Sequence, residues 1–109
     1  MNSQYKKGVL ELCVLSLLKK RDCYGDEISE YLSQHIDIAD GTVYPILRKL
    51  KADGLLTTDL QEESGGPPRK YYKLTGLGAE AYAQDRAEYL GFARTVLKLL
   101  EEDEANDQE

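Results

Sequence analysis

The sequence has little of the chemistry on which enzymes, metal proteins and disulfide-rich proteins depend. Its 109 residues include one histidine, two cysteines, one phenylalanine and no tryptophan. Cys13 and Cys23 are too few for a disulfide framework, and no CxxC pair or Cys/His cluster suggests a metal site. His35 has no second ligand or nucleophile close to it in the sequence. We therefore expect no enzyme activity, no metal and no cofactor.

Long hydrophobic runs are also absent. The most apolar stretch, 9–18, is too short to span a bilayer, and no basic segment with a small-residue cleavage site marks it as a signal peptide. We expect a cytoplasmic protein without a membrane segment. Cys13 lies in this stretch and is predicted to be a small core residue. Cys23 falls in a predicted polar turn, 19–23, where a reactive thiol is the alternative to an inert one.

The charge of the chain is unevenly distributed. The net charge is −6, which argues against non-specific coating of nucleic acid. Residues 1–75 carry equal numbers of basic and acidic side chains, so the whole excess of negative charge lies in residues 76–109. A local basic surface therefore remains available in the first 75 residues. The length supports one domain, near the size at which dimerisation helps stability.

One segment, 41–56, has the pattern of a short helix with an apolar face and a basic face. Val43, Ile46, Leu47 and Leu50 recur at helical spacing, and Gly54 is suited to end the helix. The other faces carry Thr42, Tyr44, Pro45, Arg48, Lys49 and Lys51, with no carboxylate before Asp53. Pro45 favours a start near Thr42, which can cap the helix; a start at Asp40 instead would bring a small distortion at Pro45. The pattern fits either a helix that contacts a polyanion or an ordinary solvated helix.

Two more helices precede this segment, and a hairpin follows it. The first, about 5–20, is apolar almost all round and needs cover from more than one side, which a second subunit could supply through Leu10 and Val14. The second, about 24–34, is expected to bury Ile28 and Leu32 together with His35 or Ile36. Short β-prone runs at 55–60 and 69–74 predict two strands around the loop 61–68. Alternation then directs Arg69, Tyr71 and Lys73 outward, with Lys70 exposed near the tip.

The last helix is predicted to start after Thr75 and to run for about 28 residues, or roughly 42 Å. Its apolar positions approximate a heptad seam, which predicts a coiled-coil-like dimer contact. The seam and its candidate interface residues are Tyr82, Tyr89, Phe92, Val96 and Leu99. From Glu101 onward the acidic tail is expected to fray. We therefore predict a mainly α-helical fold with a small β-hairpin: a winged helix-turn-helix DNA-binding domain over 1–75 and a dimerisation helix over 76–109.

Several short motifs, in order, resemble the PadR family of bacterial transcriptional regulators. They are Tyr24-Gly25, Gly41-Thr42-Val43-Tyr44-Pro45, Leu50 with Asp53-Gly54-Leu55-Leu56, and Arg69-Lys70-Tyr71-Tyr72 with Leu74-Thr75 and Gly78. The resemblance covers roughly residues 8–100. It implies a dimeric repressor that places the third helix in the major groove and the hairpin, or wing, against the DNA backbone or minor groove. A single C-terminal helix is similar to the small-subunit branch of the family.

The resemblance also implies roles for particular residues. Thr42, Tyr44, Pro45 and Arg48 match the reading helix of the family, and Arg69, Lys70 and Tyr71 match its wing. Some small-subunit members bind flat hydrophobic drugs between subunits, held by a tryptophan from each long helix. This chain has Tyr89 at the equivalent position, so Tyr89 and Phe92 are candidate contacts for a small hydrophobic effector. An aromatic ring there could stack, although it offers less area than tryptophan.

The sequence is compatible with three classes of function. In the leading one, a homodimer binds an inverted-repeat site in double-stranded DNA. Thr42 and Tyr44 contact base edges or phosphates, and Arg48 contacts a guanine. The wing cations, Lys49 and Lys51 mainly neutralise phosphates. The second is a winged-helix protein-interaction module, which would be expected to have acidic residues in place of the wing cations. The third is a ligand or redox sensor, based on Tyr89, Phe92 and Cys23, in which DNA binding is secondary.

Overall fold

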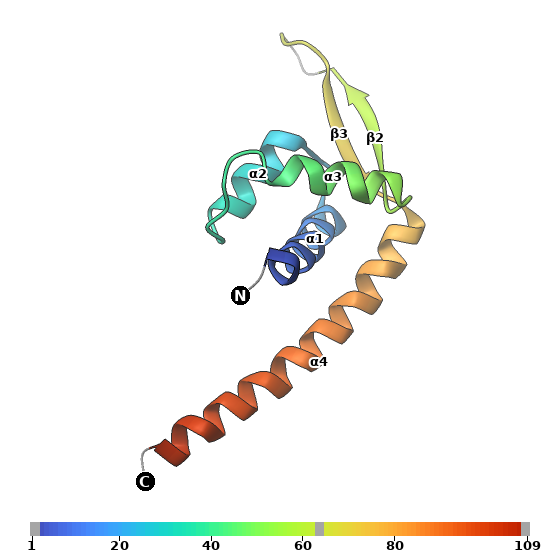
Figure 1. Ribbon diagram of the computed structural model, residues 1–109. Coiled ribbons are helices and arrows are strands. Elements are labelled where there is room, and N and C mark those ends of the chain that lie inside the picture. Colours follow the sequence, from blue (N-terminus) through green and yellow to red (C-terminus); the bar gives the residue numbers. More distant parts are fainter. Residues whose placement is uncertain (1–2, 63–64, 108–109) are drawn as a thin grey trace.

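Three helices and a three-stranded sheet form a head from which a long fourth helix projects (Figure 1). The computed structural model describes the backbone of residues 3–62 and 65–107 and the side chains of residues 6–62 and 65–103. Glu63 and Ser64 of the predicted loop, and the end of the predicted acidic tail, lie outside the described residues. The elements are α1 (Ser3–Lys20), β1 (Cys23–Tyr24), α2 (Gly25–Ser33), α3 (Val43–Ala52), β2 (Leu56–Gln61), β3 (Arg69–Leu74) and α4 (Gly76–Asp107).

The core lies where α1, α2, α3 and the sheet meet. The apolar face predicted for α3 is confirmed, because its residues at helical spacing are all buried. In α2, Ile28 and Leu32 are buried as predicted, whereas His35 is exposed and Ile36 is half-buried. Among the side chains that the structure describes, the buried hydrophobic ones are Leu10, Val14, Leu15, Leu17, Leu18, Cys23, Ile28, Leu32, Val43, Ile46, Leu47, Leu50, Leu56 and Tyr72.

The apolar residues of α1 that a partner could still cover are not the ones that were predicted. Leu10 and Val14 were expected at a dimer interface, but the core of the single chain already buries them, to 3% and 0% exposure. Little of either side chain remains for a second subunit. Val9 and Leu12 are only half-buried, so α1 does keep an incompletely covered apolar strip beside them.

The sheet contains one strand more than the predicted hairpin. Its order is β1-β3-β2, and both pairs of neighbours are antiparallel. Strand β3 has the predicted range, and β2 begins one residue later than predicted. Cys23, predicted to lie in a turn, is instead in β1, where it pairs with Tyr72 and is fully buried. This two-residue strand joins the start of α2 to the wing.

Helix α4 is capped as predicted and is longer than predicted. The Thr75 hydroxyl accepts a hydrogen bond from the Gly78 N–H at 2.9 Å and donates one to the Gly54 carbonyl at 2.7 Å. The helix then runs for 32 residues, about 48 Å at the usual rise, and with the head it gives the molecule a length of 64 Å. Its first turns pack on α1, where the Tyr82 hydroxyl lies 3.5 Å from the Ser16 hydroxyl.

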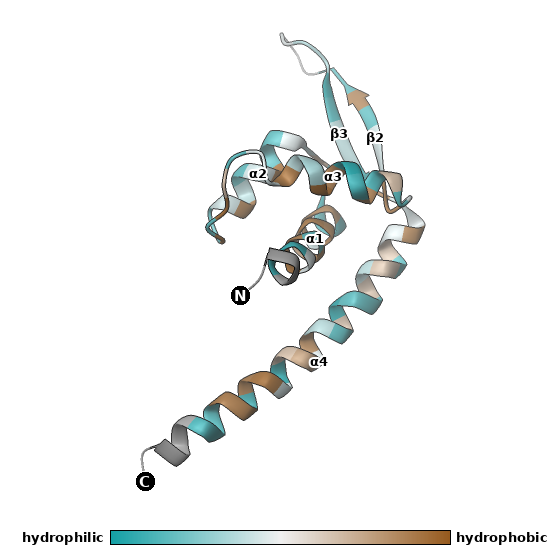
Figure 2. Ribbon diagram, in the orientation of Figure 1, coloured by the Kyte–Doolittle hydropathy of each residue, from teal (hydrophilic) through white to brown (hydrophobic). Residues whose placement is uncertain are grey.

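The outer half of α4 carries an exposed apolar band (Figure 2). Phe92, Leu97, Leu99 and Leu100 are 57–61% exposed. Among the described residues, the other large apolar side chains with comparable exposure, Leu60 and Leu77, lie apart from this band. Within the described part of the chain, no helix is long and apolar enough to cross a membrane. The helix continues to Asp107, beyond Glu101, and fraying of this tail stays a prediction.

Candidate nucleic-acid interface

Helix α3 lies across the head with its buried face on α1 and α2 and its other faces open. Pro45 is its third residue, so the missing N–H falls in the first turn, where it costs little. Gly54, at φ +79°, ends the helix in a left-handed conformation that glycine adopts without strain. The Leu55 N–H donates to the Leu50 carbonyl at 2.9 Å and the Gly54 N–H to the Lys51 carbonyl at 3.0 Å. Thr42 precedes the helix but makes no side-chain cap hydrogen bond.

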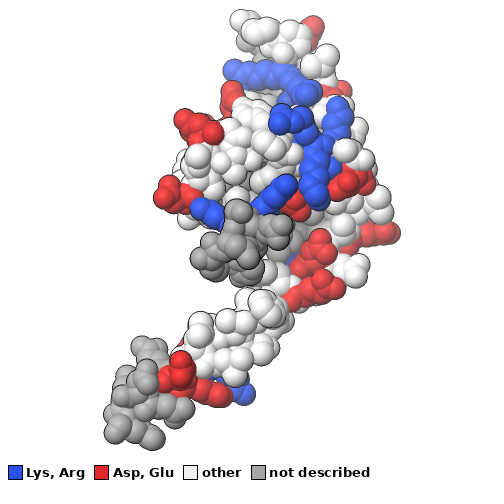
Figure 3. Space-filling view, viewed as in Figure 1, with Lys and Arg blue, Asp and Glu red and all other residues white. Residues whose placement is uncertain are grey.

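A groove of 520 Å³ separates α3 from the wing and from the start of α2. Arg48 comes from α3, Arg69 and Lys70 come from β3, and Asp26 is the only carboxylate among the lining residues. Figure 3 shows the lysine and arginine side chains gathered over α3 and the hairpin. The complete lining is Tyr24, Gly25, Asp26, Tyr44, Arg48, Arg69, Lys70 and Tyr72. The structure thus brings part of the predicted reading helix and part of the predicted wing to one concave, basic surface.

Tyr44 is held inside this groove by α2. Its hydroxyl donates a hydrogen bond to the carboxylate of Asp26, and this bond is the main cause that raises the pKa of Tyr44. The ring lies directly over Gly25, where an added Cβ would come within 2.9 Å of the ring carbon Cε1. Tyr44 is therefore half-buried and fixed in place, whereas the sequence predicted a ring on the open side of α3.

The base of the wing is stiffened by aromatic contacts with β1. The Arg69 guanidinium lies 4.5 Å from the centre of the Tyr24 ring, a cation–π contact. Tyr24 also meets Tyr71 edge to face, with ring centres 5.5 Å apart. The Lys70 ammonium lies 5.6 Å from the centre of the Tyr72 ring, and Tyr72 is buried. These contacts position two wing cations above a rigid aromatic base.

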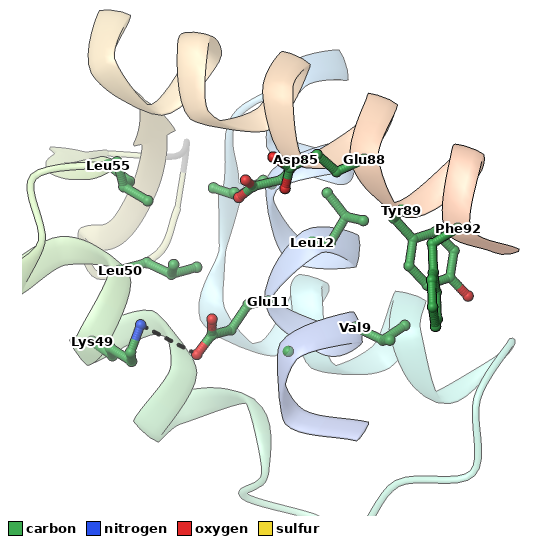
Figure 4. A pocket seen from close by; sticks show the side chains of 12 residues that line it. Val9, Glu11, Leu12, Lys49, Leu50, Leu55, Asp85, Glu88, Tyr89 and Phe92 are labelled. Carbon is green, nitrogen blue, oxygen red and sulfur yellow. Dashed lines mark ion pairs between the residues drawn. The ribbon is translucent and has the colours of Figure 1, made fainter. Parts of the chain in front are cut away.

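Lys49 points away from the groove, toward α1. Its ammonium lies 3.4 Å from the Glu11 carboxylate (Figure 4). It also lies 3.2 Å from the Asp53 carboxylate. The hydrogen bond to Asp53 is the first cause of its raised pKa. Lys49 thus lines a different cavity, between α1, α3 and α4, and its charge is largely balanced within the chain.

The remaining predicted contacts lie around the groove rather than in it. Thr42 and Pro45 line a separate hollow of 510 Å³ at the start of α3, beside Lys6 and Lys7 of α1. Lys51 is exposed near the end of α3. Lys73 is near Asp22 at 3.9 Å, on the β1 side of the sheet.

The surroundings of the two cysteines do not favour redox chemistry. Cys23 is fully buried, and this burial is the main cause that raises the pKa of its thiol, so the reactive thiolate is disfavoured. Burial also raises the pKa of Cys13. Among the described residues, no group of three or more His, Cys, Asp or Glu side chains could hold a metal ion.

Four groove residues, Tyr24, Gly25, Asp26 and Tyr72, were not among the DNA contacts predicted from the sequence. Asp26 received no role in the sequence analysis, because nothing in the local sequence links it to Tyr44. Tyr24 was taken as the first residue of α2, although its pairing with Tyr71 makes it a strand residue. Both assignments depend on contacts between segments that are far apart in the sequence.

This arrangement, a three-helix head with a basic third helix beside a basic β-hairpin, defines a winged helix-turn-helix DNA-binding protein. Residues 14–84 match the family model described as "Transcriptional regulator PadR-like family", and the chain belongs to this family. It is a transcriptional regulator and not an enzyme.

Individual relatives agree along most of the chain. The transcriptional regulator Rv3488 of Mycobacterium tuberculosis is 32% identical over 95 residues, which cover 86% of this chain and 88% of the relative. A solved PadR-like transcriptional regulator from Bacillus cereus is 35% identical, with a TM-score of 0.82 over 90% of this chain and 97% of that one. A PadR-like transcription factor from Bacteroides fragilis is 40% identical, with a TM-score of 0.74 over 89% and 95% of the two chains.

Proposed function

We propose that this regulator is a homodimeric, sequence-specific repressor that binds an inverted-repeat operator and is released by a small hydrophobic effector. The observation that carries the DNA-binding part is the basic groove shared by α3 and β3. Cations from two elements converge on one open surface there, as the phosphate backbone of a duplex requires. Such a regulator would act in the bacterial cytoplasm, where the chromosome is.

Within this proposal, α3 supplies the base contacts and the wing supplies most phosphate contacts. Arg48 is exposed on the groove side of α3 and can form two hydrogen bonds with a guanine in the major groove. Arg69, Lys70 and Tyr71 serve the backbone, with Lys51 and Lys73 at the edges. Thr42 and Pro45 lie at the start of α3, the end of a recognition helix that meets base edges. Lys49 has the weakest claim, because Glu11 and Asp53 already balance its charge.

The exposed apolar band of α4 supports the homodimer. Phe92 and Leu99 are each 59% exposed, and Val96 lies between them on the predicted seam. Burying such a band against a second copy would remove apolar surface from water, which a monomer leaves exposed. A twofold axis would then set two α3 helices on one face of the duplex, with half-site centres about 10 base pairs apart or a multiple of that.

The cavity between α1, α3 and α4 supports an effector. It measures 580 Å³ and is lined by Tyr89 and Phe92 of α4 and by Val9 and Leu12 of α1 (Figure 4). These apolar and aromatic residues suit a flat hydrophobic compound, and the acidic Asp85 and Glu88 of α4 line the same cavity. The Glu11–Lys49 ion pair lies on the wall of the same cavity, so an occupant would sit beside a residue of α3.

The protein-interaction alternative has weaker support, because the wing keeps its cations at Arg69, Lys70 and Lys73. The redox-sensor alternative is weaker still, because the Cys23 thiol is buried.

The test compares Arg48→Ala with Val43→Ala on two duplexes, a site selected from a random pool and a scrambled sequence of the same composition. Arg48→Ala should cost about 1–3 kcal/mol on the selected site and much less on the scrambled one. Val43→Ala instead removes buried methyl groups, so it should lower thermal stability before it changes base preference. Equal losses on both duplexes for Arg48→Ala would make that residue a phosphate contact and contradict the proposal.

A further inference from the structure

We propose that Asp26 is a specificity-determining residue, whose carboxylate, with the hydroxyl oxygen of Tyr44, accepts a hydrogen bond from a base amino group in the major groove. The amino group that best fits a carboxylate is N4 of cytosine. This inference rests on the proposed reading of DNA by α3. It assigns a base contact to α2, a helix to which the sequence analysis gave no contact with DNA.

Asp26 lies next to the end of α3 that would approach the bases. Tyr44 is the second residue of α3, and the Tyr44 hydroxyl is bonded to the Asp26 carboxylate. The N-terminal residues of a recognition helix are those that approach base edges. The carboxylate therefore lies one hydrogen bond away from the base-facing end of α3, and it is exposed to the groove.

The direction of the Tyr44–Asp26 hydrogen bond leaves two acceptors in the groove. Tyr44 uses its only hydroxyl proton on Asp26, so it presents an acceptor lone pair to the groove. An ionised carboxylate is also an acceptor only. A phosphate oxygen cannot pair with either group, and its negative charge is repelled by Asp26. Base amino groups are the donors that the major groove offers.

The other charged residues of the groove are cations. Arg48, Arg69 and Lys70 line the same groove, so one carboxylate lies among three cations. These cations can hold the backbone close while Asp26 faces the bases. The fixed ring of Tyr44 over Gly25 holds the carboxylate's partner in one place, so the two acceptors have a defined position.

The experiment uses the full-length protein, a duplex selected from a random pool and a scrambled duplex of equal composition. Asp26→Ala should weaken binding to the selected duplex by about tenfold, the usual scale of a base contact. The same variant should tighten binding to the scrambled duplex by a few fold, because a charge that repels phosphate is gone. Opposite signs on the two duplexes are the expected result, since a residue that only supports the fold would shift both the same way.

Two further variants control for charge and folding. Glu30→Ala removes the same charge from an exposed position of α2 outside the groove, and should change both duplexes in the same direction and by less. Asp26→Asn keeps an oxygen for the Tyr44 hydroxyl and gains a donor. It should therefore lose the preference for cytosine over thymine, whose O4 is an acceptor, at one position of each half-site.

The outcomes separate this inference from the proposed function. If the wild-type protein does not distinguish the selected duplex from the scrambled one, the proposed sequence-specific binding fails. If the wild type distinguishes them, but Asp26→Ala changes both in the same direction or changes neither, Asp26 does not contact a base. If Asp26→Asn retains the full preference for cytosine at every position, the carboxylate is likewise excluded as the contact.

Discussion

Gly78→Ala should destabilise the junction between the wing and α4. A Cβ at this position would lie 2.8 Å from the side chain of Leu74 and 3.0 Å from the carbonyl carbon of Leu55, with the Leu55 oxygen closer still. Real Cβ atoms do not approach backbone this closely, so the start of α4 must move by about 1 Å to restore an ordinary contact of about 3.3 Å. The Leu55 carbonyl also accepts the Thr75 N–H at 3.1 Å, a bond that this movement would stretch.

The expected loss follows from these contacts. Overpacking costs about 1–3 kcal/mol, and a weakened hydrogen bond adds up to about 1 kcal/mol. Alanine returns about 0.5–1 kcal/mol through its better helix propensity, which leaves a net loss of about 2 kcal/mol. For a domain of this size that corresponds to a fall in Tm of roughly 10 °C.

Circular dichroism melts and urea titrations at equal protein concentration measure this loss. Gly76→Ala is the matched control, since it lies in the same first turn of α4 and an added Cβ there meets nothing within 4 Å. It should match the wild type or exceed its stability by up to about 1 kcal/mol, through the same gain in helix propensity. The reasoning is refuted if Gly78→Ala melts together with Gly76→Ala, because the close approach to Leu55 would then cost nothing.

Three other predictions follow from the proposed DNA contacts, the α4 band and the groove. Lys70→Ala should weaken binding to the selected and the scrambled duplex alike, and should reduce the slope of log affinity against log salt concentration by about one. If the variant instead relaxed the preference at one base and left this slope unchanged, the wing would contact bases. The double variant Val96→Asp/Leu99→Asp should be monomeric or insoluble in light scattering, and a well-folded dimer would contradict the proposed seam. The hydrogen bond to Asp26 raises the pKa of Tyr44 in the folded protein. This bond therefore stabilises the fold at every pH below the pKa of an unfolded tyrosine, about 10, and its contribution is lost as the pH rises through the higher pKa of the folded state. In ¹³C-tyrosine NMR, Asp26→Ala should lower this pKa, and an unchanged titration would show that the bond is absent in solution.

The parts of the fold that periodicity controls could be predicted from the sequence. Burial of Ile46 and Leu50 follows from a spacing that puts them on one face of a helix, whatever packs against it. The end of α3 follows from Gly54, because few other residues adopt a positive φ as readily. The cap at Thr75 follows from local chemistry as well, since its hydroxyl needs only an N–H three residues away.

Strand β1 could not be predicted, because two residues have no measurable period. Its existence depends on pairing between Cys23 and Tyr72, which are far apart in the chain. The same long-range contact buries the Cys23 thiol and brings Tyr24 beneath Arg69. Because this strand was not predicted, neither the burial of the Cys23 thiol nor the position of Tyr24 in the groove was expected.

For the candidate interface, the sequence likewise predicted the exposed face of α3 but not the residues that contact it. A helical wheel separates the basic side of α3 from its apolar side, but it does not say which other element each cation meets. Arg48 opens onto the groove, whereas Lys49, the next residue, meets Glu11 of α1. Equal charge in the sequence thus becomes unequal availability to DNA, because one lysine is balanced within the chain. The same argument applies to Tyr44, whose hydroxyl is on the expected helix but already bonded to Asp26. Only the packing of α1 and α2 against α3 determines which polar groups of the reading helix remain for a duplex.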